Sequence, residues 1–165
     1  MYDQHEALSL RGMHILSELL ESKLSEIRTA AAACISALLT NPDGKTVANE
    51  MDLLKLLLPI LFSEDRAESA NAAGCITFMT TTTPAKLRAV ELDIIGRLLF
   101  LAGDFHCLQP QLHCIKALTN IAEAPKGREI LRQYGTDKIR SIPSQNEEIV
   151  ERSICTLIGV IQWKP

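Results

Sequence analysis

The sequence has few aromatic residues and no long apolar run. Phe, Trp and Tyr together make up 4% of its 165 residues, whereas hydrophobic residues reach 47%. A core must therefore be built mostly from Leu, Ile and Ala, whose small side chains let helices approach closely. No apolar stretch approaches the roughly 20 residues that span a bilayer, and residues 1–14 lack the apolar centre of a signal peptide. We expect no membrane insertion.

The charge and the cysteines of the sequence argue against two further classes of protein, nucleic-acid-binding proteins and secreted disulfide scaffolds. The net charge is −3 with no run of five like charges, so the chain has no basic arm to hold nucleic acid. An odd number of cysteines without framework spacing is typical of reduced thiols rather than of a secreted disulfide scaffold. We therefore expect a cytoplasmic protein without a nucleic-acid partner. The cysteines are Cys34, Cys75, Cys107, Cys114 and Cys155.

The motifs of common enzymes are also missing. No glycine-rich loop follows a strand, because the sequence contains no convincing strand. Ser36 and Ser153 lie in helical segments without a His-acid arrangement nearby. The paired acids Glu147 and Glu148 fit the positive start of a helix better than a catalytic dyad. We expect no enzyme, no cofactor and no small-molecule substrate.

Two His-Cys pairs form the most suggestive metal pattern: His106 and Cys107, then His113 and Cys114. Structural zinc sites favour ligands two to four residues apart on a turn, whereas Cys114 falls on an apolar helix face and His106 in a loop. We interpret these residues as core thiols and surface imidazoles, and we expect no metal.

A helical pattern is clearest in residues 111–135. Apolar residues recur there three apart, which predicts a helix of about three turns. Pro125 ends this helix, because proline disfavours helical geometry in Ala124 before it. A second helix begins near Lys126, and Gly135 stops it.

The same pattern occurs twice earlier in the chain. Two-residue signatures lie 41 and 42 residues apart, and a period in the forties built of helical segments is typical of a helical solenoid. Four long helices start near 26, 66, 111 and 147. The signatures are Gly44-Lys45, Ala85-Lys86 and Gly127-Arg128.

Local signals give the expected limits of the helices. Ser25 and Asn146 are candidate N-caps, residues 41–44 and 143–145 form turns, and Pro59 kinks or breaks its helix. The expected helices cover 6–22, 26–40, a short segment through Val47 and Met51, 53–62, 66–80, 86–92, 93–101, 111–124, 126–135, 136–142 and 147–162.

The order of two short helices and one long third helix, with the segment 117–131, resembles the armadillo repeat family. The resemblance implies an all-α fold: a right-handed α-solenoid of about four armadillo-like repeats. We expect a single domain over 1–165, with units at 12–51, 52–91, 92–134 and 135–165. Segments 23–45, 70–82 and 115–128 are most similar to the armadillo-repeat proteins of radial spokes.

This resemblance implies a non-catalytic scaffold that binds proteins, including radial spoke or axonemal components, in the cytoskeleton of motile cilia and flagella. The alternative is an adaptor for flexible peptides in transport or signalling. Such adaptors use a ladder of asparagines with Trp four residues earlier; here only Asn120 stands in place, preceded by Lys116. In the other three long helices, the residues at the Trp and Asn positions of the ladder are Ala33 and Ala37, Gly74 and Phe78, and Cys155 and Gly159.

The ladder is therefore incomplete, and we expect Asn120 to bond a neighbouring carbonyl rather than a ligand. The candidate partner-binding face consists of Lys116, Asn120 and Phe78.

Overall fold

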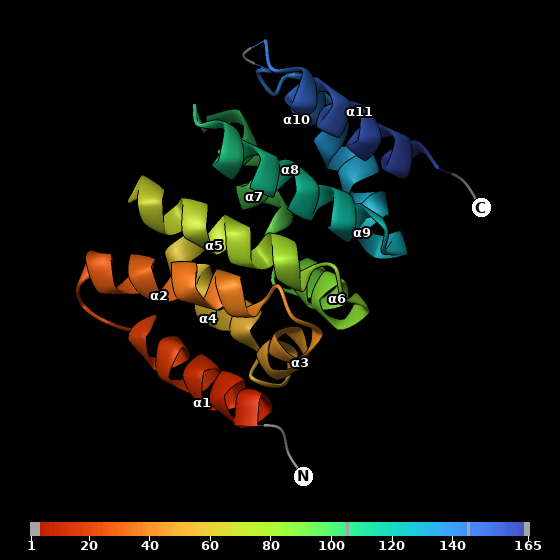
Figure 1. Ribbon diagram of the computed structural model, residues 1–165. Coiled ribbons are helices and arrows are strands. Elements are labelled where there is room, and N and C mark those ends of the chain that lie inside the picture. The colour runs from red at the N-terminus through yellow and green to blue at the C-terminus, as the bar shows by residue number, and fades with distance from the viewer. Residues whose placement is uncertain (1–3, 105, 145, 164–165) are drawn as a thin grey trace.

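Four long helices form the spine of the protein. The computed structural model describes residues 4–104, 106–144 and 146–163. Each long helix packs on the next, and together they cross the molecule as parallel layers from the N-terminal to the C-terminal end (Figure 1). The four predicted long helices are confirmed. They are α2 (Ser25–Leu38), α5 (Arg66–Met79), α8 (Leu108–Ala122) and α11 (Glu148–Gln162).

Shorter helices connect the long ones. Helix α1 (Gln4–Leu19) is as long as the four spine helices, with 16 residues, but stands before them and packs on α2 and α3 at one end of the stack. The described residues contain no strand, and the predicted all-α solenoid is confirmed. None of the described helices has the length and apolar character to cross a membrane. The connecting helices are α3 (Pro42–Glu50), α4 (Leu53–Leu61), α6 (Thr83–Glu91), α7 (Ile95–Asp104), α9 (Pro125–Ile130), the π-helix η1 (Leu131–Gly135) and α10 (Thr136–Arg140).

The core is one continuous strip between the helical layers. It consists almost entirely of aliphatic side chains, as the composition predicts, and most of the aromatic side chains that the structure describes stay near the surface. Phe62, Phe100 and Trp163 are each more than half exposed. Among the largest fully buried side chains are Leu39, Leu57, Ile60, Ile76, Leu98 and Ile115.

The predicted N-cap at Ser25 is wrong. Leu24 occupies the cap position of α2 and makes no side-chain bond. The Ser25 hydroxyl instead donates to Asp65 Oδ2 at 2.8 Å. Asp65 is the working cap of α5, because its Oδ1 accepts from the amides of Ala67 and Glu68 at 2.8 and 3.2 Å. The bond from Ser25, followed by these amide bonds, lowers the pKa of Asp65.

Prolines explain two further differences, and a third difference occurs at a proline inside a helix. The segment 41–44 is not a turn, because Pro42 opens α3. Helix α8 begins at Leu108, three residues before the expected start, with Pro110 in its first turn. First-turn amides have no acceptor within the helix, so proline costs little there. The predicted break at Pro59 is also wrong, since α4 continues to Leu61.

The predicted helix end at Gly135 and the predicted N-cap at Asn146 are also wrong. Gly135 does not end a helix: it has φ −106° and ψ −23°, and the chain passes through η1 directly into α10. Asn146 is not the cap of α11, because Glu147 occupies that position. Asn146 has φ 62°, a left-handed conformation that asparagine tolerates. The expected turn at 143–145 includes Gln145, which lies outside the described residues.

Candidate functional site

The predicted partner-binding residues lie on adjacent long helices. Phe78 belongs to α5, and Lys116 and Asn120 belong to α8. Asn120 Nδ2 donates to the carbonyl of Thr77 at 3.1 Å and lies 3.3 Å from the hydroxyl oxygen of Thr80. The amide hydrogens of Asn120 therefore bind α8 to α5, which is the kind of bond that we expected of this residue.

Phe78 lies beside His113 of α8. Their ring centroids are 6.5 Å apart with the planes tilted by 57°. Gly74 makes room for the imidazole, because a Cβ at position 74 would stand 3.3 Å from His113 Nδ1. Burial, followed by the charge of Lys116, lowers the pKa of His113, so the ring is neutral at physiological pH. Around Phe78 and His113 the partner-binding face is therefore formed by two contacting rings that carry no charge.

A small pocket of about 200 Å³ lies between α8 and α11. Each of its three hydroxyls donates to the carbonyl four residues earlier on its own helix, at 2.7 to 2.9 Å. Their oxygen lone pairs remain as acceptors, and the ammonium group of Lys116 supplies a donor. These groups complement the amide and carbonyl groups of a polypeptide. The pocket is lined by Lys116, Thr119, Asn120, Ser153 and Thr156.

No row of asparagines extends this pocket along the stack. The equivalent residues on α2, Ala33 and Ala37, are exposed and apolar, and those on α11, Cys155 and Gly159, are exposed without an amide side chain. Asn120 is therefore an isolated polar contact rather than one rung of a ladder.

The two His-Cys pairs do not share an environment. His106 and Cys107 are exposed before α8, whereas Cys114 is fully buried. Burial raises the pKa of the Cys114 thiol to about 12, which disfavours the thiolate form that binds metals. Within the part of the chain that the structure describes, no three His, Cys, Asp or Glu side chains gather in a way that could hold a metal ion.

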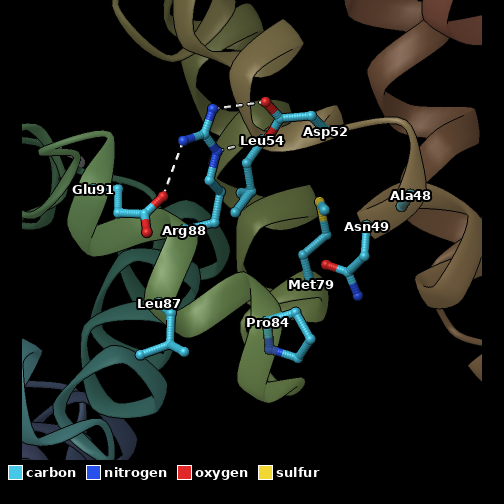
Figure 2. A pocket seen from close by; sticks show the side chains of 9 residues that line it. All are labelled: Ala48, Asn49, Asp52, Leu54, Met79, Pro84, Leu87, Arg88 and Glu91. Atoms are coloured by element: carbon cyan, nitrogen blue, oxygen red, sulfur yellow. Dashed lines mark hydrogen bonds and ion pairs between the residues drawn. The ribbon is translucent and has the colours of Figure 1, made fainter.

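A second pocket, which we call the ridge pocket, lies where α6 meets the turn between α3 and α4 (Figure 2). It measures about 320 Å³. Its floor is apolar and formed by Ala48, Leu54 and Met79, which are at most 2% exposed. Pro84 and Leu87 form the α6 side of the opening, and Leu87 is 49% exposed.

The rim of the ridge pocket carries a charged network. Arg88 donates from Nε to Asp52 Oδ1 at 2.9 Å and from Nη2 to Asp52 Oδ2 at 2.7 Å. Its Nη1 also donates to Glu91 Oε2 at 3.0 Å, so Figure 2 shows the guanidinium between two carboxylates. The bond from Arg88 lowers the pKa of Asp52, although partial burial opposes the shift.

The sequence interpretation missed the ridge pocket, but the repeat contains a signal for it. Helices α3, α6 and α9 align from their first residues. The second and fifth residues of α6 are Pro84 and Leu87, which are exposed and apolar. The second and fifth residues of α3 and of α9 are polar. The polar counterparts, also exposed, are Asp43 and Thr46 in α3 and Lys126 and Glu129 in α9.

Known structures share this architecture. A search against models of protein families finds none that matches the chain. One crystal structure of an engineered protein is similar with a TM-score of 0.83 and 19% identity over 92% of this chain and 63% of that chain. A second engineered protein gives a TM-score of 0.84 and 18% identity, over 93% of this chain and 38% of that chain.

Another similar structure is described as computationally designed armadillo repeat proteins for modular peptide recognition. It has a TM-score of 0.77 and 15% identity, covering 97% of this chain and 76% of that chain. The chain thus spans less than two thirds of the length of each of the two engineered proteins with TM-scores of 0.83 and 0.84. At these identities the likeness shows the fold: a right-handed α-solenoid of armadillo-like repeats.

Proposed function

We propose that this chain is a non-catalytic scaffold that binds other proteins through the face formed by its long helices. The observation that carries the proposal is the placement of Phe78, Lys116 and Asn120 on α5 and α8, which the Asn120 bonds join. A rigid stack holds such side chains at fixed separations, so a partner meets a preformed surface.

The assembly that we propose for this scaffold is the radial spoke of motile cilia and flagella. The support is the sequence resemblance of segments 23–45, 70–82 and 115–128 to the C-terminal half of the radial spoke head 14 protein. The partners would then be radial spoke or other axonemal proteins, and the protein would lie in the axoneme and the surrounding cytoplasm.

Localisation in ciliated cells tests the assembly. Tagged protein should lie along motile axonemes and should co-purify with spoke components identified by mass spectrometry. Absence from motile cilia, with the tagged protein expressed and folded, would remove the radial spoke from the proposal. The scaffold itself is tested by Lys116→Ala, which should weaken partner capture without changing the helix content measured by circular dichroism.

A second candidate is an adaptor for flexible peptides. The pocket between α8 and α11 favours it, because its hydroxyl oxygens and the Lys116 ammonium complement a peptide backbone. The isolated asparagine argues against a long groove. A peptide array would distinguish the two candidates: motif-specific binding that Asn120→Ala abolishes supports the adaptor, and its absence supports the scaffold.

A further inference from the structure

The exposed apolar side chain of Leu87 is not required by the fold, whereas Pro84 opens α6 as Pro42 and Pro125 open α3 and α9. The equivalent helices α3 and α9 occupy the same place in their units with a polar residue at the position of Leu87. Pro84 and Leu87 expose apolar surface beside a buried apolar floor. Such surface gains free energy when a partner covers it.

The cation of the rim is likewise specific to this unit, although the acids are not: α3 has Glu50 where α6 has Glu91, and Asp93 repeats the left-handed backbone of Asp52. Arg88 stands where α3 has Val47 and α9 has Ile130, both aliphatic. It reaches back to Asp52, whose φ of 51° turns the backbone between α3 and α4 toward the opening. Asp52 is compensated by Arg88 and also by the nearby charge of Lys55. Glu91 pairs with Arg88 alone, and its side chain is 61% exposed, so Glu91 is the carboxylate of the rim that is open to a further cation.

The dimensions and the charge limit what the pocket can hold. Its volume of about 320 Å³ is at the lower end of ligand pockets, which measure roughly 300 to 1,000 Å³. It therefore suits one or two side chains better than a large cofactor. The carboxylates at the rim disfavour nucleic acids and anionic lipid headgroups, and they favour a cation.

We propose that the ridge pocket docks a protein segment that inserts one aliphatic side chain over Met79 and places a Lys or Arg beside Glu91. The aliphatic side chain covers the apolar floor and packs on Leu87. The cation pairs with the exposed carboxylate of Glu91. The opening of this pocket lies on α3, α4 and α6, with Met79 of α5 as part of its buried floor. Lys116 and Asn120 of the proposed function lie on α8, which contributes no residue to the pocket.

Two capped tetrapeptides test this inference: Ala-Leu-Arg-Ala and Ala-Leu-Glu-Ala, each with an acetylated N-terminus and an amidated C-terminus. They are titrated into the whole chain while the methyl resonance of Met79 is followed by NMR. The Leu-Arg probe should shift the resonance saturably and bind about fivefold more tightly than the Leu-Glu probe, the ratio expected for one exposed charge pair.

Two variants distinguish docking from nonspecific contact. Leu87→Thr introduces the residue type that α3 has at this position, and it should abolish the shift. Glu91→Gln should retain binding but remove the preference for the Leu-Arg probe. Lys116→Ala, on the other face, should change neither. An unmoved Met79 methyl, equal binding of the two probes, or full binding by Leu87→Thr would each overturn the proposal.

Discussion

Gly44 packs directly against the backbone carbonyl of Leu38: a Cβ at position 44 would stand 2.2 Å from that oxygen. The contact recurs two units later, where a Cβ on Gly127 would stand 2.3 Å from the carbonyl oxygen of Ile121. In both places the backbone of a short helix contacts the backbone at the end of the preceding long helix: α3 contacts α2, and α9 contacts α8. The equivalent Ala85 is fully buried, so that junction accommodates a methyl group.

Gly44→Ala should therefore destabilise the protein. The methyl group would meet backbone atoms that cannot rotate away, and the resulting shift of α3 should cost about 2–3 kcal/mol of the free energy of unfolding. Gly96→Ala is the matched control, because nothing lies within 4 Å of its added Cβ. In an exposed helical position alanine should stabilise by about 0.5–1 kcal/mol. Urea denaturation measures both changes, and equal stabilities of the two variants would disprove the contact.

Asn120→Ala should reduce stability even in the absence of any partner. The variant loses the bond from Nδ2 to the carbonyl of Thr77, a buried residue, and that acceptor then has one donor fewer. We expect a loss of about 1–2 kcal/mol. Lys116→Ala, one turn earlier and exposed, should change stability by less than about 0.5 kcal/mol. If urea denaturation finds Asn120→Ala as stable as the unaltered protein, the residue serves a ligand and not the packing of α8 on α5.

The ion pair between Arg28 and Glu68 should give the protein a defined acid sensitivity. Glu68 is 1% exposed. Burial would raise its pKa, but Ser63, Ser25 and Arg28 stabilise the carboxylate and hold the pKa below its ordinary value of 4.5. A carboxyl group with a lowered folded pKa contributes stability above its unfolded pKa, and this contribution is lost as the pH falls through the folded value.

Arg28→Ala should therefore cost about 2 kcal/mol at pH 7, since it leaves a buried carboxylate without its cation. The difference from the unaltered protein should shrink as the pH falls from the ordinary value of 4.5 through the lowered folded pKa of Glu68, at which the buried carboxylate itself becomes protonated. Arg152→Ala removes a pair whose side chains are 75% and 82% exposed, and it should have little effect at any pH. A difference for Arg28→Ala that stays constant down to pH 3 would contradict this account.

The sequence predicts the architecture well because helical periodicity and the repeat period both act over long windows. Four long helices and the intervening short ones lie near their expected places. The errors arise where one residue type has two opposite local uses. Pro42 opens a helix although proline is also a turn residue, and Gly135 continues a helix although glycine commonly ends one. Only the three-dimensional neighbours decide between such alternatives.

The two candidate surfaces also differ in how far the sequence predicts them. Alignment of the long helices identifies Asn120 as isolated, and the structure adds the acceptors of its bonds. The ridge pocket depends on contacts between units, because Asp52 and Arg88 are 36 residues apart and meet only when α6 packs near α4. A sequence pattern within one helix carries no information on that contact.

The five cysteines should separate into two reactivity classes. Cys34, Cys107 and Cys155 are exposed, whereas Cys75 and Cys114 are buried. Burial raises the pKa of both buried thiols to about 12, and the thiolate is the reactive form. A disulfide reagent such as dithionitrobenzoate, at neutral pH, should therefore modify three thiols rapidly in the folded protein and leave two protected.

Guanidinium chloride provides the control, because all five thiols should react at one rate once the chain unfolds. The protected pair also reports on the stack itself. Cys75 donates from its thiol to the carbonyl of Ala32 at 3.1 Å, across the contact between α2 and α5. Separation of these two helices would expose Cys75 while Cys114 stays protected in the next layer. Rapid modification of either buried thiol in the folded protein would contradict the layered packing described for α2, α5 and α8.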